Sequence, residues 1–584
     1  MRNRIFFVVL FFTFLSIGKL YNNILFMAMD DEIRRSITRL QIENQKKPYY
    51  ISYRIEEREY IKIKASFGGL LYSNRNRIRD LYVDLRIGDY SFDNSNFVAR
   101  ISHSRIIGSD YTSLPLDDNY DALRNDLWLI TDGTYKKALE ELSRKKATIQ
   151  NQQVKDQTSD FSKVTSNTAM EPAVKLAIDE AVWENTIVTL SRIFQKYPDI
   201  QESSITFYSR AGNQYFLDTE GSKSQQGALL TYIEVTAKAQ SKDGNPIEDI
   251  LGFYCHAPDE LPDIATISRK VEAMAETLTL QIVLEETEDY SGPVLFVGQA
   301  AAEFMFQILG KGVSDPRKPL FENETVSGSA GRDMGVLANR IGRRVISSFL
   351  HAYDDPTLKK WNGKPLVGYF AVDDQGVPAK KAEIIKDGKL CGVLMSRTPT
   401  KKIDISNGHG RFKDERFGSR VCGMVGNLII EADETKSHSE MKEMLIDICR
   451  NYEIPYGIIV TRLEITRPRT LRERYMGYFT SMTSGSEKPI LSSPVVAYKI
   501  DVETKTVELI RGLTFSSVTP RVLRDIVASG NEDFVYNFVF WDEEGNAYPM
   551  SVITPSILVE EMDIETSGKK ARKLPILNHP YFKN

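Results

Sequence analysis

Two runs of alternating apolar and polar residues near the start of the chain most constrain its fold. Residues 61–65 read IKIKA, and residues 81–87 read LYVDLRI. Side chains of a β-strand point alternately to its two faces, so a period of two predicts half-buried antiparallel strands between 49 and 97. Gly68-Gly69 and Gly88-Asp89 are typical turn sequences. The chain is therefore expected to begin with an antiparallel sheet.

Helical spacing of apolar residues follows this sheet. It predicts a helix over 121–145, interrupted at the turn-prone Asp132-Gly133, and a second helix over 174–197. Residues 146–172 between them are polar and lack periodicity, which favours an exposed connection.

A hairpin and a third helix are predicted next. Two short apolar runs flank Ala211-Gly212-Asn213, which is typical of a β-hairpin. Residues 264–284 again have helical spacing. The first part of the chain is therefore expected to combine helices with an antiparallel sheet.

The length of 584 residues requires more than one hydrophobic core, because single cores stop growing at roughly 250 to 300 residues. We place the boundary between 285 and 292, which predicts an N-terminal α+β domain over 30–290 and a C-terminal domain over 291–584. The second domain is expected to be mostly β and barrel-like or sandwich-like. Its expected strands cover 364–372, 380–386, 390–395, 427–431, 456–465, 495–502 and 506–513, with helices over 439–451 and 520–529.

The N-terminal residues resemble a signal peptide. Arg2 and Arg4 precede an apolar run from Ile5 to Leu15, and the small residues Ser16 and Gly18 follow. This order of charge, apolar core and small residues is typical of secretory signals. We expect a signal peptide over 1–18, extended to 28 if it acts as an uncleaved anchor. The mature protein is then exported, and this segment is its only expected membrane contact.

Composition excludes several classes of protein. Hydrophobic residues make up 42% of the chain, charged residues 26%, and the formal net charge is −4. This balance is typical of a globular protein and indicates no nucleic-acid partner. Cys255, Cys391, Cys422 and Cys449 form no Cys-x-x-Cys pair, so their disulfide state stays open. The sequence has no Gly-x-Ser-x-Gly elbow and no Walker loop.

Several blocks of sequence, taken in order, resemble the TldD/PmbA family of metallopeptidases and their inactivated homologues. The order and spacing of the blocks carry this resemblance. The blocks are Asp160–Lys163, Ser291–Phe296 with Gln299–Glu303, Asp373–Pro378, Asp387–Leu390, Ser406–Arg411, Glu508–Leu513, Thr519–Gly530 and Pro555–Glu561.

The resemblance implies a zinc site that this chain lacks in sequence. Active members of the family carry His-Glu-x-x-x-His on the helix after the strand at 293–297, and a later cysteine. Zinc needs three N, S or O ligands and an open position for water. Residues 297–304 contain no histidine, and residues 492–514 contain no cysteine. We therefore expect no metal and no other cofactor.

Few residues remain as candidates for a site. Glu303 is a weak catalytic candidate, because a single carboxylate on an Ala-rich helix is more often solvated or in a salt bridge. His409 lies between glycines in an Asn407-Gly408-His409-Gly410-Arg411 loop that we expect to be exposed. Asn407, His409 and Arg411 are therefore predicted to line a peptide groove, with a purely structural glycine turn as the alternative.

The resemblance implies one leading function and leaves two alternatives. The leading hypothesis is a non-catalytic subunit that pairs with a zinc-bearing TldD-like paralogue, or with itself, in the proteolysis of peptides. The first alternative is a hydrolase with an altered site that uses Glu303 and His409. The second is an exported, stand-alone peptide-binding protein.

Overall fold

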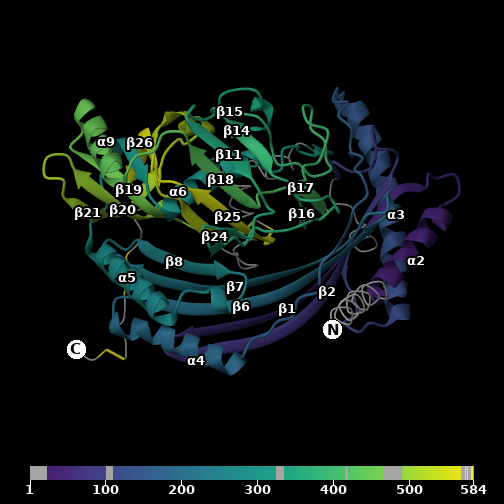
Figure 1. Ribbon diagram of the computed structural model, residues 1–584, viewed down its shortest axis with the longest axis horizontal. Helices are drawn as coiled ribbons and strands as arrows, with labels where there is room; N and C mark the ends of the chain where they lie inside the picture. The colour runs from purple at the N-terminus through teal and green to yellow at the C-terminus, as the bar shows by residue number, and fades with distance from the viewer. Residues whose placement is uncertain are drawn as a thin grey trace, which may run out of the picture.

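A computed structural model describes residues 23–99, 110–323, 334–414, 419–464, 490–542 and 544–566, with positions 573, 575, 581 and 582 near the C-terminus. The expected signal peptide at 1–18 lies outside the described residues. The chain forms a long curved sheet with helices on its outer face, and a second, mostly β part sits over the concave face (Figure 1). The expected α+β class is confirmed.

The curved sheet has seven strands in the order β4-β2-β1-β6-β7, and both β5 and β8 pair with β7. All pairings are antiparallel except β5 with β7. The strands are β1 (Pro48–Ser66), β2 (Gly69–Ile87), β4 (Tyr111–Ser113), β5 (Thr168–Met170), β6 (Glu202–Asp218), β7 (Lys223–Gln240) and β8 (Pro246–Cys255). Phe67 and Gly68 close the β1–β2 hairpin with φ of 50° and 83°, as a two-residue turn of type I′ requires. The predicted turn at Gly68 is confirmed.

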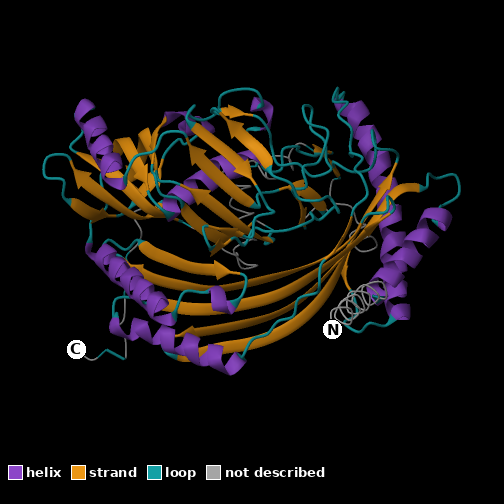
Figure 2. Ribbon diagram, viewed as in Figure 1, coloured by secondary structure: helices purple, strands orange, loops and turns teal. Residues whose placement is uncertain are grey.

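Two pairs of helices cover the convex face of this sheet at opposite ends (Figure 2). One pair is α2 (Ile24–Arg39) with α3 (Tyr120–Gln152), and the other is α4 (Glu180–Ser191) with α5 (Ile264–Val283). Each pair has its own hydrophobic core against the strands. Between the two cores the same face of β1 carries Glu57 and Glu59, which accept hydrogen bonds from Arg77 and Arg75 of β2.

Three predictions for this part are wrong in detail. Helix α3 continues through Asp132-Gly133, because its caps and buried face outweigh one glycine and Lys136 donates to Asp132. Residues 174–179 are not helical. Ala211-Gly212-Asn213 is not a turn, since β6 runs straight through it and pairs with β1 and β7 on both sides.

The polar connection at 146–172 is only partly an exposed segment. Its first residues extend α3 to Gln152, and residues 168–170 form β5. Asp160, Phe161 and Ser162 are buried. Asp160 accepts from Lys145, and Arg317 of the second part lies 3.3 Å from it. A polar sequence is therefore buried here because charged partners from both parts of the chain satisfy it.

The second part contains two larger sheets around a short buried helix. One has six strands in the order β15-β14-β11-β18-β25-β24, and the other seven, in the order β21-β20-β19-β9-β26 with β22 and β23 also on β26. Their strands are β9 (Tyr290–Phe296), β11 (Leu350–Asp354), β14 (Ala382–Lys386), β15 (Lys389–Leu390), β18 (Asn427–Ala432), β19 (Tyr456–Leu463), β20 (Pro494–Asp501), β21 (Val507–Ile510), β22 (Leu513–Phe515), β23 (Ile526–Ser529), β24 (Phe534–Trp541), β25 (Ala547–Thr554) and β26 (Ile557–Thr566). The mostly β character is confirmed.

The remaining elements are short or lie at the edge of the sheets. Helix α6 (Gln299–Met305) continues through a π turn (Phe306–Gly310) into α7 (Lys311–Val313), and α9 (His438–Asn451) packs outside the seven-stranded sheet. Two-stranded pairs are β3 (Phe97–Val98) with β10 (Leu320–Phe321), β12 (Lys360–Trp361) with β13 (Lys364–Pro365), and β16 (Gly410–Lys413) with β17 (Arg420–Gly423).

The helix predicted over 520–529 is only half correct. Thr519 caps it and Pro520 begins it as expected, but it is a 3₁₀ helix that ends at Asp525, and Ile526–Ser529 pair with β26. The four cysteines, all in the described part, form no disulfide. Among the described helices, none combines the length and apolar character needed to cross a membrane.

Candidate functional site

Helix α6 is the element on which the family resemblance would place a catalytic metal. It begins after Gly298, whose φ of 58° lets the chain turn sharply from the end of β9 into the helix. Ala300, Ala301 and Ala302 are fully buried, so the small side chains let the helix pack closely between the two sheets. Any group on this helix is therefore held in a rigid and largely dry environment.

Glu303 is buried on α6. It lies neither in solvent nor in a salt bridge, although the sequence predicted one of these two environments. Its side chain accepts hydrogen bonds from Gln299 Nε2 at 2.8 Å and the Tyr536 hydroxyl at 3.1 Å. The backbone N–H of Leu463, in β19, donates to its other oxygen at 2.7 Å. One carboxylate thus joins α6 to β24 and β19. Two of these three donors could not be predicted, because Leu463 and Tyr536 lie 160 or more residues away in the chain.

The environment of Glu303 favours its protonated form. Burial raises its pKa from about 4.5 to about 7, although the three hydrogen bonds and the charge of Arg462 act in the opposite direction. Burial also raises the pKa of the neighbouring Tyr536 well above its usual value. A carboxyl with a pKa near neutrality is the kind of group that general acid–base catalysis uses, but structural networks produce the same shift.

Glu303 should make the stability of the protein depend on pH. Its pKa is raised on folding, so the stabilisation is complete below the unfolded value and is lost as pH rises toward 7. The difference in free energy of unfolding between the wild type and Glu303→Gln should therefore shift by on the order of 2 to 3 kcal/mol, against the wild type, from pH 5 to pH 8. Urea unfolding of both proteins at each pH measures it. If the free energies of unfolding of the two proteins changed with pH in parallel, the pKa of Glu303 would not be raised on folding.

The residues around α6 do not fit zinc. Both oxygens of Glu303 already accept hydrogen bonds, and its partners are an amide, a phenol and a backbone N–H. None of the histidines or cysteines in the described part contacts this carboxylate. Three ligands and an open position are needed for catalytic zinc, so one occupied carboxylate does not provide a site.

His409 is fully buried, and the expectation of an exposed loop is wrong. Its Nε2 lies 3.1 Å from Asp354 Oδ1, and its Nδ1 lies 2.9 Å from Asn407 Oδ1. Asn407 in turn accepts from the backbone N–H of Met395 and donates to the carbonyl of Val393. Two of the three predicted groove residues therefore form an internal network.

Arg411 lies apart from this network. It begins β16 beside Gly410, with 24% of its side chain exposed. Its guanidinium packs on the ring of Phe370 at 4.7 Å, and its Nε lies 3.8 Å from Asp374. No hydrogen bond or ring contact between described residues joins Glu303 to His409, and the altered site that would use both stays a prediction. A role in a peptide groove remains a prediction for these residues.

A different histidine has carboxylates beside it. His351 of β11 lies 3.0 Å from Asp433 and 3.9 Å from Asp387, and the three ligand atoms are within 4.8 Å of one another. The two aspartate side chains are 69% and 63% exposed, which is typical of a surface ion-pair cluster. The sequence suggested no such group, since three separate strand ends bring it together.

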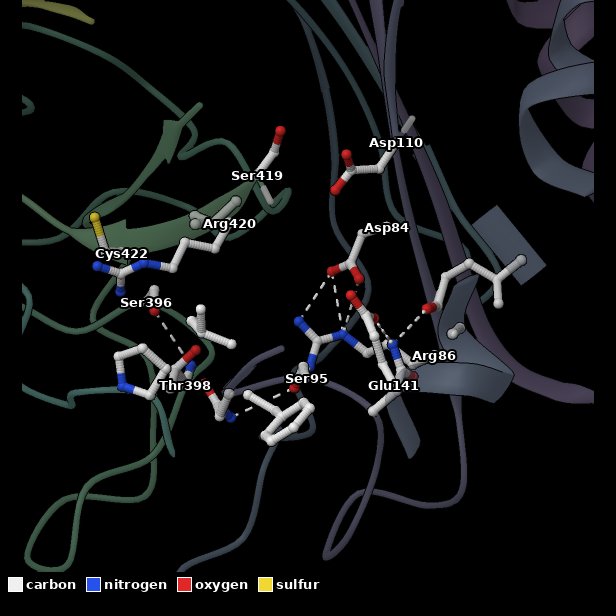
Figure 3. Close-up of a pocket in the computed structure, with 18 of the residues that line it drawn as sticks. Asp84, Arg86, Ser95, Asp110, Glu141, Ser396, Thr398, Ser419, Arg420 and Cys422 are labelled. Carbon is white, nitrogen blue, oxygen red and sulfur yellow. Dashed lines mark hydrogen bonds and ion pairs between the residues drawn. The ribbon is translucent and has the colours of Figure 1, made fainter. Parts of the chain in front are cut away.

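A cavity of about 110 Å³ lies between the two parts of the chain (Figure 3). The end of β2 and α3 form one wall, and the loops around 315–319, 396–398 and 419–423 form the other. Charges of both signs line it. Arg86 is held by Asp84 and Asp93, and Arg420 lies against Asp315. Because these paired charges largely neutralise one another, the cavity shows no preference for a ligand of one sign.

Arg397 connects the two parts of the chain and was not predicted. Its side chain is fully buried and donates twice to the carbonyl of Ser162, at 3.0 and 2.7 Å. Its guanidinium also lies 2.7 Å from Glu220 and 3.8 Å from the centre of the Phe161 ring. Burial raises the pKa of the nearby Asp218 to about 6. A charged residue of the second part is thus inserted into the first.

The fold and the α6 site together define a class of protein: a metallopeptidase-like architecture without the usual ligands on its central helix. Residues 291–485 match the family described as the PmbA/TldA metallopeptidase C-terminal domain. A metalloprotease of Archaeoglobus fulgidus is 38% identical over 76 residues, which is 13% of this chain and 16% of that protein, so the match covers about a sixth of the relative.

Solved structures extend the likeness to nearly the whole chain. TldE from Thermococcus kodakarensis aligns with a TM-score of 0.54 and 14% identity, over 92% of this chain and all of that one. A proposed modulator of a DNA gyrase from Thermotoga maritima aligns with a TM-score of 0.53 and 16% identity, over 88% and 96%. At these identities the structures show the fold alone. The family match covers residues 291–485, about a third of the chain, and the solved structures show a TldE-like fold over nearly the whole chain.

Proposed function

We propose that this chain is a non-catalytic TldD/PmbA-family subunit that pairs with a zinc-bearing paralogue, or with itself, in peptide proteolysis. The observation that carries the proposal is the chemistry of α6. The helix that would present metal ligands presents alanines and one carboxylate that is already hydrogen-bonded on both oxygens. The fold is kept while the groups that zinc requires are replaced by a packed internal network.

Two further parts of the proposal rest on sequence. Export follows from the signal-like residues 1–18, and peptide binding follows from the family. A stand-alone peptide-binding protein is the second candidate, because one face of the curved sheet carries the neighbouring rings of Tyr60, Tyr208, Tyr232 and Tyr254 whether or not a partner is present.

Metal content and pairing test the proposal together. The purified chain should hold well below one zinc per molecule and show no chelator-sensitive peptidase activity, because α6 offers no ligand set. Plasma emission spectroscopy after dialysis measures the metal. The control is His351→Ala, which removes the histidine from the one group of three possible metal ligands found among the described residues. Zinc that is lost in this variant is surface-bound and leaves the proposal intact.

Co-expression with a zinc-bearing paralogue from the same genome tests the pairing. The two chains should elute as one complex in size-exclusion chromatography, with zinc only in the paralogue. Stoichiometric zinc in this chain that survives His351→Ala would refute the non-catalytic assignment. A chain that binds peptides but never associates with the paralogue would favour the stand-alone binding protein.

A further inference from the structure

The concave face of the curved sheet carries a row of four tyrosines across neighbouring strands. The row consists of Tyr60 of β1, Tyr208 of β6, Tyr232 of β7 and Tyr254 of β8. The ring centres of successive neighbours in this order are 5.8, 4.9 and 5.3 Å apart. Tyr208 and Tyr232 are directly paired in the ladder, as are Tyr232 and Tyr254. All four are half-buried, whereas the alternate residues of these strands are fully buried under the helices. We call this row the tyrosine ladder.

The tyrosine ladder ends at the α6 site. The carbonyl of Tyr254 accepts a hydrogen bond from Asn537, which follows Tyr536 in β24. Tyr536 is the residue whose hydroxyl donates to Glu303. Tyr232 and Tyr254 also pack against Val367 and Val539 of the second part. The row therefore begins at Tyr60 of β1 and ends at Tyr254, where both parts of the chain meet.

Cationic groups that make no hydrogen bond with a described residue lie beside the ladder. The guanidinium of Arg210 makes no hydrogen bond or ion pair with any residue that the structure describes, and its Nε is buried. Arg210 pairs with Tyr60 across the strands, on the same face. Lys62 and Lys64 of β1, on this face, likewise have no partner within the described ranges. The amide nitrogen of Gln214 is buried and unpaired as well.

The acidic groups on this face already have partners. Glu234, two residues from Tyr232 in β7, bonds to the hydroxyl of Tyr254. Glu56 is engaged by Arg54 at 3.4 Å and by Arg58 at 3.6 Å. Burial favours the neutral form of Glu56, but Arg58, Arg54 and Arg210 outweigh it and lower its pKa to about 2. Asp80 is held by Arg58. The face thus keeps a positive excess around Arg210, whose buried Nε without a hydrogen bond is costly unless a ligand satisfies it.

The geometry points to an acidic peptide as the ligand: we propose that the concave face binds an extended peptide through its carboxylates, with Arg210 as the anchor and the hydroxyls of Tyr60, Tyr208 and Tyr232 as hydrogen-bond donors along the ladder. A guanidinium matches a carboxylate with two parallel hydrogen bonds. The inference rests on the proposed function, because it names the chemistry of the peptides that such a subunit would hold.

Single-stranded nucleic acid fits this face less well. Bases bind proteins by stacking on open aromatic faces. In the ladder the ring planes of Tyr208 lie at 27° to Tyr60 and at 22° to Tyr232, so the rings face one another. The hydroxyl edges of Tyr60, Tyr208 and Tyr232 suit carboxylates and peptide groups, whereas the hydroxyl of Tyr254 already bonds to Glu234.

Fluorescence anisotropy with three labelled probes tests the inference on the isolated full chain. The probes are a twelve-residue Asp/Glu-rich peptide, its Asn/Gln counterpart and an oligothymidylate of equal charge. The acidic peptide should bind about tenfold or more tightly than the neutral one, since a charge-assisted pair contributes roughly 1.5 to 3 kcal/mol. The oligothymidylate should bind no better than the neutral peptide.

Arg210→Gln should weaken binding of the acidic peptide about tenfold and leave the neutral peptide unchanged. Tyr208→Phe should weaken it by a few fold, because it removes only a hydroxyl. The matched control is Arg269→Gln on the outer face of α5, where the arginine contacts only Thr266 and should not affect binding. Arg210→Gln also removes one of the charges that favour ionised Glu56, so the unfolding midpoint of the variant is measured beside its affinity, and binding is compared where both proteins are folded.

Each other result overturns the inference. Equal binding of acidic and neutral peptides, an unchanged affinity in Arg210→Gln, or equally strong binding of the oligothymidylate would do so. These failures are separate from failure of the proposed function, which is decided by zinc content and pairing. A chain that pairs with the paralogue but ignores peptide charge would keep the function and lose this inference.

Discussion

Replacing Arg397 by alanine should lower the free energy of unfolding by about 3 to 5 kcal/mol, because it removes one partner of a buried ion pair. The variant leaves Glu220 and Asp218 without their guanidinium. It also removes both hydrogen bonds that the carbonyl of Ser162 accepts from Arg397 in the wild type. It also opens space over the ring of Phe161. Urea unfolding at pH 7.5 measures the loss.

Two further variants separate charge from packing. Arg397→Met keeps most of the side-chain volume and should still be strongly destabilised, because the carboxylates stay buried and unpaired. Adding Glu220→Gln to Arg397→Ala should restore part of the stability, since it removes one of those charges. Arg269→Ala on the outside of α5 should change stability by less than about 0.5 kcal/mol. A loss below about 1 kcal/mol for Arg397→Ala would show that water reaches this contact.

His409→Ala should destabilise the protein by about 2 to 4 kcal/mol, through a lost hydrogen bond to a buried group and the cavity left behind. Asp354 is fully buried and would keep only the backbone N–H groups of Gly426 and Asn427 as donors. This result would follow from the burial of His409, which contradicts the exposed loop expected from the glycine-rich sequence.

Arg411→Ala is the matched control in the same segment. Its side chain is partly exposed, so the variant should lose less than about 1 kcal/mol. Phe515→Ala, in the buried strand β22, gives the scale for a core truncation of about 3 to 5 kcal/mol. Chemical unfolding of the three variants ranks them. If His409→Ala behaved like Arg411→Ala, the buried network would contribute nothing to stability.

Local sequence patterns predicted the elements whose cause is local. The alternation at 61–65 and 81–87 specified β1 and β2, and helical spacing specified α5 and α9 nearly to the residue. The failures have a common cause. Ala211-Gly212-Asn213 resembles a turn, but β1 and β7 hold it in a strand on both sides. Tertiary pairing outweighed the local preference for a turn.

The site was less predictable than the fold because its residues meet only in three dimensions. The missing histidines on α6 could be seen in the sequence, yet Glu303 looked like a surface carboxylate until Tyr536 and Leu463 were placed beside it. The glycines around His409 were interpreted as freedom for ligand contact. Gly408 has a φ of 73°, and a Cβ there would lie 2.2 Å from the carbonyl of Pro378, so the glycine serves close packing instead.

The two separate cores on the convex face of the sheet affect how the molecule loses structure. Strand β1 has 19 residues and therefore spans roughly 60 Å, too far for one helix pair to cover. Glu57 and Glu59, with their arginines, occupy the uncovered middle and contribute little hydrophobic stabilisation. Amide hydrogens under α2 and α3 and those under α4 and α5 should thus exchange as two cooperative units, joined by strands they share but with different opening free energies.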